Sequence, residues 1–377
     1  MDQREGWNVM AITLVVAVGL SLYVGRMQAA VTLPPESRPL KRQFYKKLNT
    51  CANVEAFVQH QVKLWWDKDK SIAPKLLKIL YADCMINGCD ASILLDGPHT
   101  EKKAIQDLSV DGFRLIDKIK TVVDDRCKGP VVSCADILNL AVRDALHLAG
   151  APSYPVYLGR RDGLGSNAAW VDLPSPSISS EGGLAYFRSK GLDAQDYVTL
   201  LGDCLISTYQ FLYLLSERKS KLPSSAVPLS GSHTIGKAHC SYIRNRLYNF
   251  NKTGKPDPTM SKSTLDKLRR QCPSSLKKGQ EDPTVFLTDK YGPNYTFSNA
   301  YYSNVLSKDS VLRVDQQLLF NKNTSPKVLE YAGKFEEFRQ GFALSMSRMG
   351  GLKVLTGKQG EIRRNCRFTN KNNPKIK

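Results

Sequence analysis

Residues 78–92 read Lys-Ile-Leu-Tyr-Ala-Asp-Cys-Met-Ile-Asn-Gly-Cys-Asp-Ala-Ser. This stretch combines an apolar segment with a short loop rich in oxygen donors. Asp83, Asp90 and Ser92 place three side-chain oxygens within ten residues, and Gly88 permits a tight turn that exposes backbone carbonyls. Hard oxygen donors on a compact loop suit Ca²⁺, which takes about 6–8 such ligands. A solvated acidic turn has the same composition, so both interpretations stand at this point.

The N-terminus has the layout of a targeting signal. Arg4 precedes an apolar run from Met10 to Val24, and Ala29-Ala30 follows it. The run has 15 residues, whereas a membrane span needs about 20. We expect a secretory signal peptide over residues 1–30, with an uncleaved anchor as the alternative.

Cysteine usage and sequons agree with export. Many cysteines behind a secretory signal predict disulfides formed in an oxidising compartment. Asn251, Asn294 and Asn323 each begin a glycosylation sequon. The number of cysteines is odd, so at least one is left over. The nine are Cys51, Cys84, Cys89, Cys127, Cys134, Cys204, Cys240, Cys272 and Cys366.

The chain is strongly basic, with a net charge of +19 over 377 residues. This charge describes either a solvated basic surface or one that is retained on a polyanion such as acidic cell-wall polysaccharide. The lysines are scattered and the chain is expected to be exported, which argues against nucleic acid. A mean hydropathy of −0.32 argues against a multi-span membrane protein.

Apolar residues recur with helical period in several places and rarely alternate as in strands. Helices are expected over 112–128, 132–150 and 327–350. Gly150 stops the second, and Ser325-Pro326 opens the third with a cap and a proline in its first turn. Pro- and Gly-rich stretches near 150–180 and 252–260 predict loops. The expected class is a mostly helical globule.

One histidine lies in a setting that suits a haem ligand. His233 stands in Ser-His-Thr-Ile-Gly among apolar residues, and Asp315 is a candidate carboxylate to orient it. A neutral imidazole held by a carboxylate is a strong axial donor to haem iron. A lone histidine is also compatible with a purely structural role, and the residues alone do not show that the two side chains meet.

Several short motifs stand in a fixed order along the chain. They are Phe44-Tyr45, Asp83-Cys84, Gly88-Cys-Asp-Ala-Ser92, Val132-Ser-Cys-Ala-Asp-Ile-Leu138, Gly159-Arg-Arg-Asp162, Leu173-Pro-Ser-Pro176, Gly231-Ser-His-Thr-Ile-Gly236, Val314-Asp-Gln316 and Gly360-Glu-Ile-Arg-Arg-Asn-Cys366. From about Phe44 to Asn370 the chain thereby resembles the class III secretory plant peroxidases.

The resemblance implies a mostly α, two-part helical peroxidase fold around haem b, over residues 31–370, followed by a basic tail at 371–377. It implies a monomer that is exported to the extracellular space or cell wall. Four disulfides follow from it, with Cys204 left over. The implied pairs are Cys51–Cys127, Cys84–Cys89, Cys134–Cys366 and Cys240–Cys272.

The same resemblance assigns site residues. His233 matches the iron ligand, Asp315 its hydrogen-bonding partner, and Pro174 a residue at the edge where aromatic donors bind. The distal calcium ligands match Asp83, Ile86 (through its carbonyl), Gly88, Asp90 and Ser92, and Glu101 matches the acid that links this loop to the pocket. Thr234 matches a ligand of a second calcium, whose site is weakened because Ser298 replaces an aspartate and the spacing around Asp289 is disturbed.

The distal pocket departs from the family pattern. Ala82 stands where the family has its catalytic histidine, Lys78 where it has arginine, and Asp107 aligns with the asparagine that orients the histidine. Alanine has no group to carry a proton, and Tyr81, with a pKa near ~10, is a poor base at neutral pH. Lys78 keeps a positive charge but loses the planar fork, and a buried lysine can act as a base. We expect a slow reaction with hydrogen peroxide.

A second departure is an insertion over residues 203–231, directly before the histidine motif. Joining Leu200-Leu-Gly202 to Ser232-His-Thr234 restores an uninterrupted family match. The insert contains Cys204 and an apolar run at Phe211–Leu215, and it resembles no part of the family. Our hypothesis is a retained intron in the gene model.

The sequence leaves three possible functions for this protein. The first is a haem peroxidase that uses hydrogen peroxide to oxidise small phenolic donors, with reduced activity. The second is a catalytically silent haem protein of the cell wall. The third is a calcium-dependent structural protein that adheres to pectin without haem.

Overall fold

The structure is a computed structural model that describes residues 39–108, 110–175, 177–201, 233–277, 279–288 and 294–374. The expected signal peptide, the segment 203–231 with Cys204, and Asp289 therefore lie outside the described residues. Across the described ranges, no helix has both the length and the apolar character that a membrane span requires.

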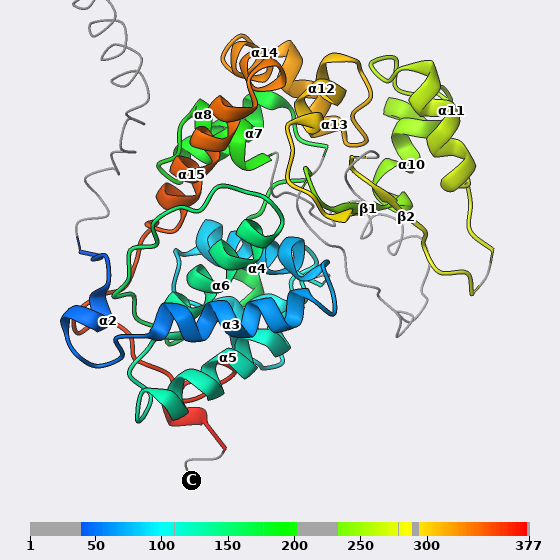
Figure 1. Ribbon diagram of the computed structural model, residues 1–377. Coiled ribbons are helices and arrows are strands. Elements are labelled where there is room, and N and C mark those ends of the chain that lie inside the picture. Colours follow the sequence, from blue (N-terminus) through cyan, green and yellow to red (C-terminus); the bar gives the residue numbers. More distant parts are fainter. Residues whose placement is uncertain are drawn as a thin grey trace, which may run out of the picture. The chain divides into compact units, whose positions relative to one another are not determined.

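Helices dominate the architecture (Figure 1). The α-helices are α2 Phe44–Lys47, α3 Val54–Trp66, α4 Ile72–Ile86, α5 Phe113–Arg126, α6 Cys134–Leu148, α7 Ser180–Ser189, α8 Ala194–Leu201, α10 Cys240–Tyr248, α11 Lys262–Gln271, α12 Ala300–Leu306, α13 Arg313–Gln317, α14 Ser325–Gly333 and α15 Phe335–Met349. Two short strands, β1 Lys237–His239 and β2 Thr284–Phe286, pair antiparallel with Ala238 opposite Val285. The mostly helical fold expected from the sequence is confirmed.

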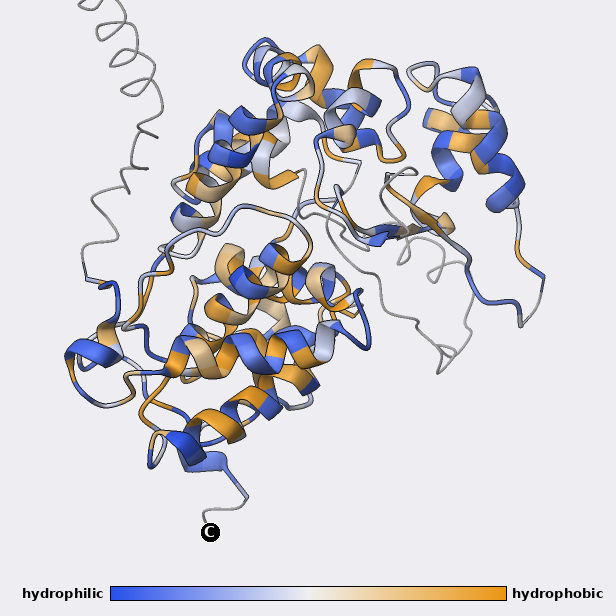
Figure 2. Ribbon diagram, viewed as in Figure 1, coloured by the Kyte–Doolittle hydropathy of each residue, from blue (hydrophilic) through white to orange (hydrophobic). Residues whose placement is uncertain are grey.

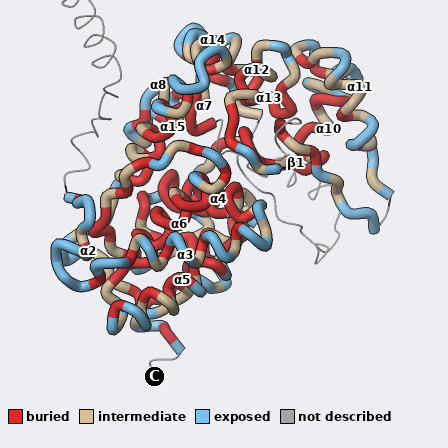
Figure 3. The backbone as a smooth tube through the Cα atoms, viewed as in Figure 1, coloured by how far each residue is buried: buried red, intermediate tan, exposed pale blue. Residues whose placement is uncertain are grey.

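One group of helices surrounds α6. Helices α3, α4 and α5 all pack against it, and α6 is buried along most of its length (Figure 3). The amphipathic pattern of α5 buries Leu115, Ile116, Ile119 and Val123, and hydrophobic and hydrophilic residues recur along this helix (Figure 2). Helix α4, which carries the distal motif, is thereby fixed within this group.

A second group consists of α7, α8, α12, α14 and α15. Its core is aromatic: Phe338 stacks on Phe297 with ring centroids 4.8 Å apart and meets Tyr302 and Tyr331 edge-on or tilted. Aromatic pairs of this kind add about 0.5–1.5 kcal/mol each beyond the area they bury. Helix α12 of this group carries Tyr301, whose ring centroid lies 6.1 Å from that of His233.

The single helix expected over 327–350 is wrong, because the structure has two helices there. Lys334 is extended (φ −130°, ψ 91°) and separates α14 from α15. Gly333 precedes it, and glycine is a poor helix former. The expected cap is also corrected: Ser325 is the first helical residue, Thr324 is the N-cap residue, and neither supplies a capping side-chain hydrogen bond.

Among the described residues, four disulfides form: Cys51–Cys127, Cys84–Cys89, Cys134–Cys366 and Cys240–Cys272. These are the pairs that the family resemblance implies. The Cys134–Cys366 bridge spans 232 residues and ties the first residue of α6 to the C-terminal segment.

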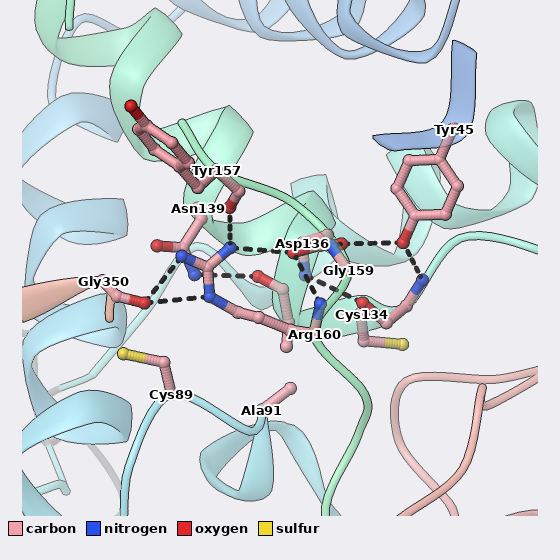
Figure 4. Close-up of polar contacts among 12 residues, drawn as sticks. Tyr45, Cys89, Ala91, Cys134, Asp136, Asn139, Tyr157, Gly159, Arg160 and Gly350 are labelled. Atoms are coloured by element: carbon pink, nitrogen blue, oxygen red, sulfur yellow. Dashed lines mark hydrogen bonds and ion pairs between the residues drawn. The ribbon is translucent and has the colours of Figure 1, made fainter. Parts of the chain in front are cut away.

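Three of the sequence motifs meet in a buried polar network (Figure 4). Asp136 Oδ2 accepts hydrogen bonds from the Tyr45 hydroxyl and the Gly159 N–H, both at 2.7 Å. Arg160 Nη1 lies 2.8 Å from Asp136 Oδ1, and Nε and Nη2 of the same guanidinium donate to the Gly350 carbonyl at 2.9 and 2.6 Å. The network joins α2, α6 and the end of α15.

Candidate functional site

His233 is fully buried and is oriented by a carboxylate. Its Nδ1 lies 2.6 Å from Asp315 Oδ1, which also accepts a hydrogen bond from the Tyr301 hydroxyl at 2.9 Å. Asp315 sits in the first turn of α13, and the His233 carbonyl accepts a bond from Thr288 Oγ1 at 3.0 Å. The ring and its backbone are therefore fixed from two sides.

This geometry fits the axial ligand of a haem. Asp315 Oδ1 is placed to accept the Nδ1–H of His233, which would leave Nε2 as the nitrogen that binds a metal. Carboxylate partners of this kind set the tautomer and raise the basicity of a metal-binding histidine. The donor that haem iron requires is present at His233.

The distal face lies on α4. Lys78 and Ala82 are one turn apart, so they share a face of the helix, and their exposed fractions are 4% and 1%. Tyr81 is also buried, with 2% exposed. The alanine side chain has no polar atom, and the amine of Lys78 is a charged group one turn away on this face.

Asp107 is a buried carboxylate near this face. It is 2% exposed, and neither Oδ1 nor Oδ2 has a hydrogen-bond partner. Burial raises the pKa of Asp107 to about 7, and the charge of Lys78 counteracts part of that rise. A turn holds the residue, since its N–H donates to the Ala104 carbonyl and its carbonyl accepts from the Val110 N–H, both at 2.9 Å.

The expected calcium loop follows α4 and is closely hydrogen-bonded. Both oxygens of Asp83 accept loop N–H groups, at 2.9 and 3.4 Å, and Asp90 Oδ1 accepts the Ser92 N–H at 3.0 Å. Ser92 Oγ donates to Glu101 Oε2 at 3.1 Å. The turn needs a glycine at position 88, where φ is +119° and a Cβ atom would lie 2.6 Å from the Lys353 carbonyl.

The chemistry of this loop fits a hard cation. Burial, followed by repulsion from Asp90, raises the pKa of Asp83 well above its usual range. Burial, followed by repulsion from Asp83, raises the pKa of Glu101 to about 9, and Oε1 of Glu101 is buried without a hydrogen-bond partner. A bound Ca²⁺ would relieve this crowding of negative charge.

The remaining donors at this loop are neutral oxygens. In the described part of the chain, no three His, Cys, Asp or Glu side chains are grouped to hold a metal ion, so the loop must add the Ser92 hydroxyl and backbone carbonyls. The Ile86 carbonyl accepts from Lys190 Nζ at 3.4 Å, and the Gly88 carbonyl accepts from the Asp90 N–H at 2.9 Å. Each carbonyl keeps a second lone pair for a cation.

The second calcium position retains only hydroxyl groups among the described residues. Thr234 Oγ1 and Ser298 Oγ are buried and have no hydrogen-bond partner. Orphaned oxygens of this kind suit a cation, but the carboxylate candidate Asp289 lies outside the described residues. A site with fewer carboxylates binds calcium more weakly.

Pro174, expected at the donor edge, is buried. The residue after it, Ser175, lines a cavity of about 210 Å³ together with Tyr242, Arg246 and Arg313. Arg246 is paired with Asp257 at 2.8 Å. The cavity places an aromatic ring and guanidinium groups next to the expected donor edge.

Two features of the site were missed by sequence reasoning. Tyr301, which donates to Asp315, stands in an ordinary Ala-Tyr-Tyr stretch that nothing marks as functional. The isolation of the Asp107 carboxylate depends on what surrounds it in space, so no sequence signal could have revealed it.

Known proteins resemble this chain over nearly its whole length. The sequence model of the peroxidase family matches residues 58–334. "Probable peroxidase 26" of Arabidopsis thaliana is 51% identical over 359 residues, covering 95% of this chain and 98% of the relative. "Probable peroxidase 61" of the same plant is 52% identical over 346 residues, covering 92% and 93%. A peroxidase of Armoracia rusticana is 38% identical over 336 residues, covering 86% and 90%.

Proposed function

Because the chain belongs to the secretory plant peroxidases, a family of haem peroxidases, we propose that it uses hydrogen peroxide to oxidise small phenolic donors outside the cell, with a slowed first step. The observation that carries the proposal is the buried pair of His233 and Asp315, with Nδ1 and Oδ1 2.6 Å apart. His233 Nε2 would bind the iron of haem b. Pro174 and the neighbouring cavity would receive the donor.

The slowed first step follows from the side chains on α4. Peroxide must lose one proton before the O–O bond breaks and must regain it on the departing oxygen. General acid–base help of this kind is typically worth about 10²–10⁴-fold. Ala82 provides none, while Lys78 retains a cation that can stabilise developing negative charge.

Restoring the histidine tests this proposal. The Ala82→His variant is expected to react with peroxide about 10²–10⁴-fold faster than the natural chain, measured by stopped-flow spectroscopy and by guaiacol oxidation. Ala82→Leu, which fills similar space without a proton-carrying group, is the control and should stay slow. A natural chain that already reacts as fast as Ala82→His would contradict the slowed step.

The second candidate function is a catalytically silent haem protein of the cell wall, which the loss of both the histidine and the arginine favours. The same guaiacol measurement distinguishes it from the peroxidase. Haem that is bound but gives no guaiacol oxidation, with activity appearing only in Ala82→His, supports the silent protein. A preparation without a Soret band excludes both candidates.

The proposal also includes calcium binding and retention of the protein at the cell wall. Asp83, Asp90 and Ser92, with the Ile86 and Gly88 carbonyls, would hold a distal Ca²⁺, and Thr234 would contribute to a weaker second site. The net charge of +19 supports binding of the protein to acidic cell-wall polysaccharide. We propose that the protein is a monomer there.

We also propose removal of residues 1–30 as a signal peptide and absence of residues 203–231 from the mature message. Sequencing the transcript tests the second point. A message that encodes Cys204 would refute the retained intron.

A further inference from the structure

We propose that Asp107 supplies part of the proton transfer that the missing distal histidine would perform, so that the slowed first step still has a general base, on a different element. This inference rests on the proposed function. It concerns one carboxylate and its surroundings, which the sequence comparison alone treats as a replaced asparagine.

The geometry carries the inference. Asp107 is 2% exposed and neither carboxylate oxygen has a hydrogen-bond partner. Buried polar groups are nearly always paired, and an unpaired carboxylate is costly, so one that persists calls for an explanation. A carboxylate with open lone pairs can accept a proton from a small molecule without first breaking another bond.

Electrostatic interactions link Asp107 to the expected distal face. Lys78 of α4 acts on it electrostatically, and Lys78 is one helical turn from Ala82, the position of the lost histidine. The other ionisable groups that interact with it are Glu101, of the short 3₁₀ turn Glu101–Lys103, and Tyr186 of α7. Side chains of three separate segments thus interact electrostatically with the carboxylate.

The affinity of Asp107 for a proton suits the task. A general base works best when its pKa lies near the working pH, and burial brings the pKa of Asp107 to about 7. Free histidine has a pKa of about 6.5. Lys78 would then have the complementary role: its charge keeps the pKa of Asp107 from rising further and faces the developing negative charge.

The proposed step is a proton transfer that balances as follows. The Asp107 carboxylate takes one proton from hydrogen peroxide, leaving the hydroperoxide anion and a carboxylic acid. The acid then returns this proton to the hydroxide that departs when the O–O bond breaks, which gives water and restores the carboxylate. Bound haem supplies the two electrons for that cleavage, and none passes through Asp107.

Cyanide binding tests the step without relying on turnover. Hydrogen cyanide must surrender a proton to bind ferric haem as cyanide, so its affinity reports on the distal base. In the ferric holoprotein we expect a break near pH 7 in the plot of cyanide affinity against pH. Asp107→Asn should remove the break and weaken binding at least ~10-fold at neutral pH, within the usual range of acid–base effects. Lys78→Met should move the break upward without removing it.

Matched variants separate this inference from its alternatives. Asp144→Asn removes another buried carboxylate whose pKa burial raises, to about 6, and it should leave the cyanide profile unchanged. Ala82→His added to Asp107→Asn should restore a break through the histidine. Infrared difference spectra of the protein with and without haem should show a carboxyl band that titrates near pH 7 and disappears in Asp107→Asn.

The outcomes are distinct. A Soret band with no break between about pH 5 and 9 in the natural chain, or a break that survives Asp107→Asn and vanishes in Lys78→Met, overturns this inference and leaves the haem protein intact. Absence of the Soret band overturns the proposed function and this inference with it. If Asp107→Asn fails to fold, the profile of the natural chain and that of Lys78→Met still decide.

Discussion

In the proposed reaction, Asp315 would act only through His233, which it contacts. Its Oδ1 receives both the Nδ1–H of His233 and the hydroxyl of Tyr301. A partner of this kind fixes the tautomer and the ring angle, and its loss typically weakens metal binding about 10–100-fold.

We therefore expect Asp315→Asn to bind haem about 10–100-fold more weakly, measured by following the Soret band during titration of the apoprotein with haemin. Tyr301→Phe removes one hydrogen bond to the same oxygen and should have a smaller effect. His233→Leu should abolish the band. Haem affinity that is unchanged in Asp315→Asn would show that the carboxylate does not position the ligand.

At the scale of single residues, the sequence identified candidates but not their contacts. His233 and Asp315 are 82 positions apart, and the residues alone left open whether they meet; the family resemblance supplied the pairing. The isolation of Asp107 could not be predicted, because a missing partner is a property of three-dimensional surroundings.

At the scale of elements, the loop that follows α4 keeps its conformation only if a glycine stands where another segment packs against it. Gly163 N–H donates to the Asp90 carbonyl at 2.8 Å, and a Cβ atom at position 163 would overlap Oδ2 of the Asp90 side chain. No ordinary packing tolerates that overlap, so the aspartate would have to leave its place in the loop.

Gly163→Ala is expected to destabilise the protein by about 1–3 kcal/mol and to reduce the gain in melting temperature that calcium gives. Thermal unfolding with added calcium and with EGTA measures both effects. Gly333→Ala is the matched control, because a Cβ atom there meets nothing within 4 Å. An equal calcium effect in Gly163→Ala and the natural chain would show that Asp90 does not hold the ion.

The apolar period of the sequence did not predict the boundary between α14 and α15. The apolar period runs on from α14 into α15 because both helices contribute rings to one aromatic core, Tyr331 from the first and Phe338 from the second. The break at Lys334 leaves this period intact. The helices expected near 112–128 and 132–150 are confirmed, since each ends where the sequence has a clear stop, as at Gly150 with φ +99°.

At the scale of the whole molecule, the ordered motifs predicted the fold because most of them are structural rather than catalytic. The stretches around Asp136 and Arg160 meet in the buried network of Figure 4. Asp162 accepts the N–H groups of Cys134 and Ala135 at 3.1 and 2.9 Å and so caps α6 beside a disulfide. None of these contacts involves Lys78 or Ala82, so the scaffold does not depend on the substitutions that we infer for the distal pocket.

The network also gives a prediction for global stability. Arg160 and Asp136 are 3% and 0% exposed, and the guanidinium satisfies the Gly350 carbonyl as well. Removing one partner of a buried pair leaves an uncompensated charge and typically costs about 3–5 kcal/mol. Arg160→Leu should therefore lose about that much free energy of unfolding, or fail to accumulate as folded protein.

An exposed pair provides the control for that experiment. Lys63 and Asp67 are separated by 2.5 Å but are each 52% exposed, so water already screens them, and such pairs contribute about 0–1 kcal/mol. Lys63→Leu, measured beside Arg160→Leu by urea unfolding with the disulfides kept intact, should lie within that range. Equal losses in the two variants would mean that burial does not set the strength of the Asp136 network, and that its three motifs join α2, α6 and α15 through packing alone.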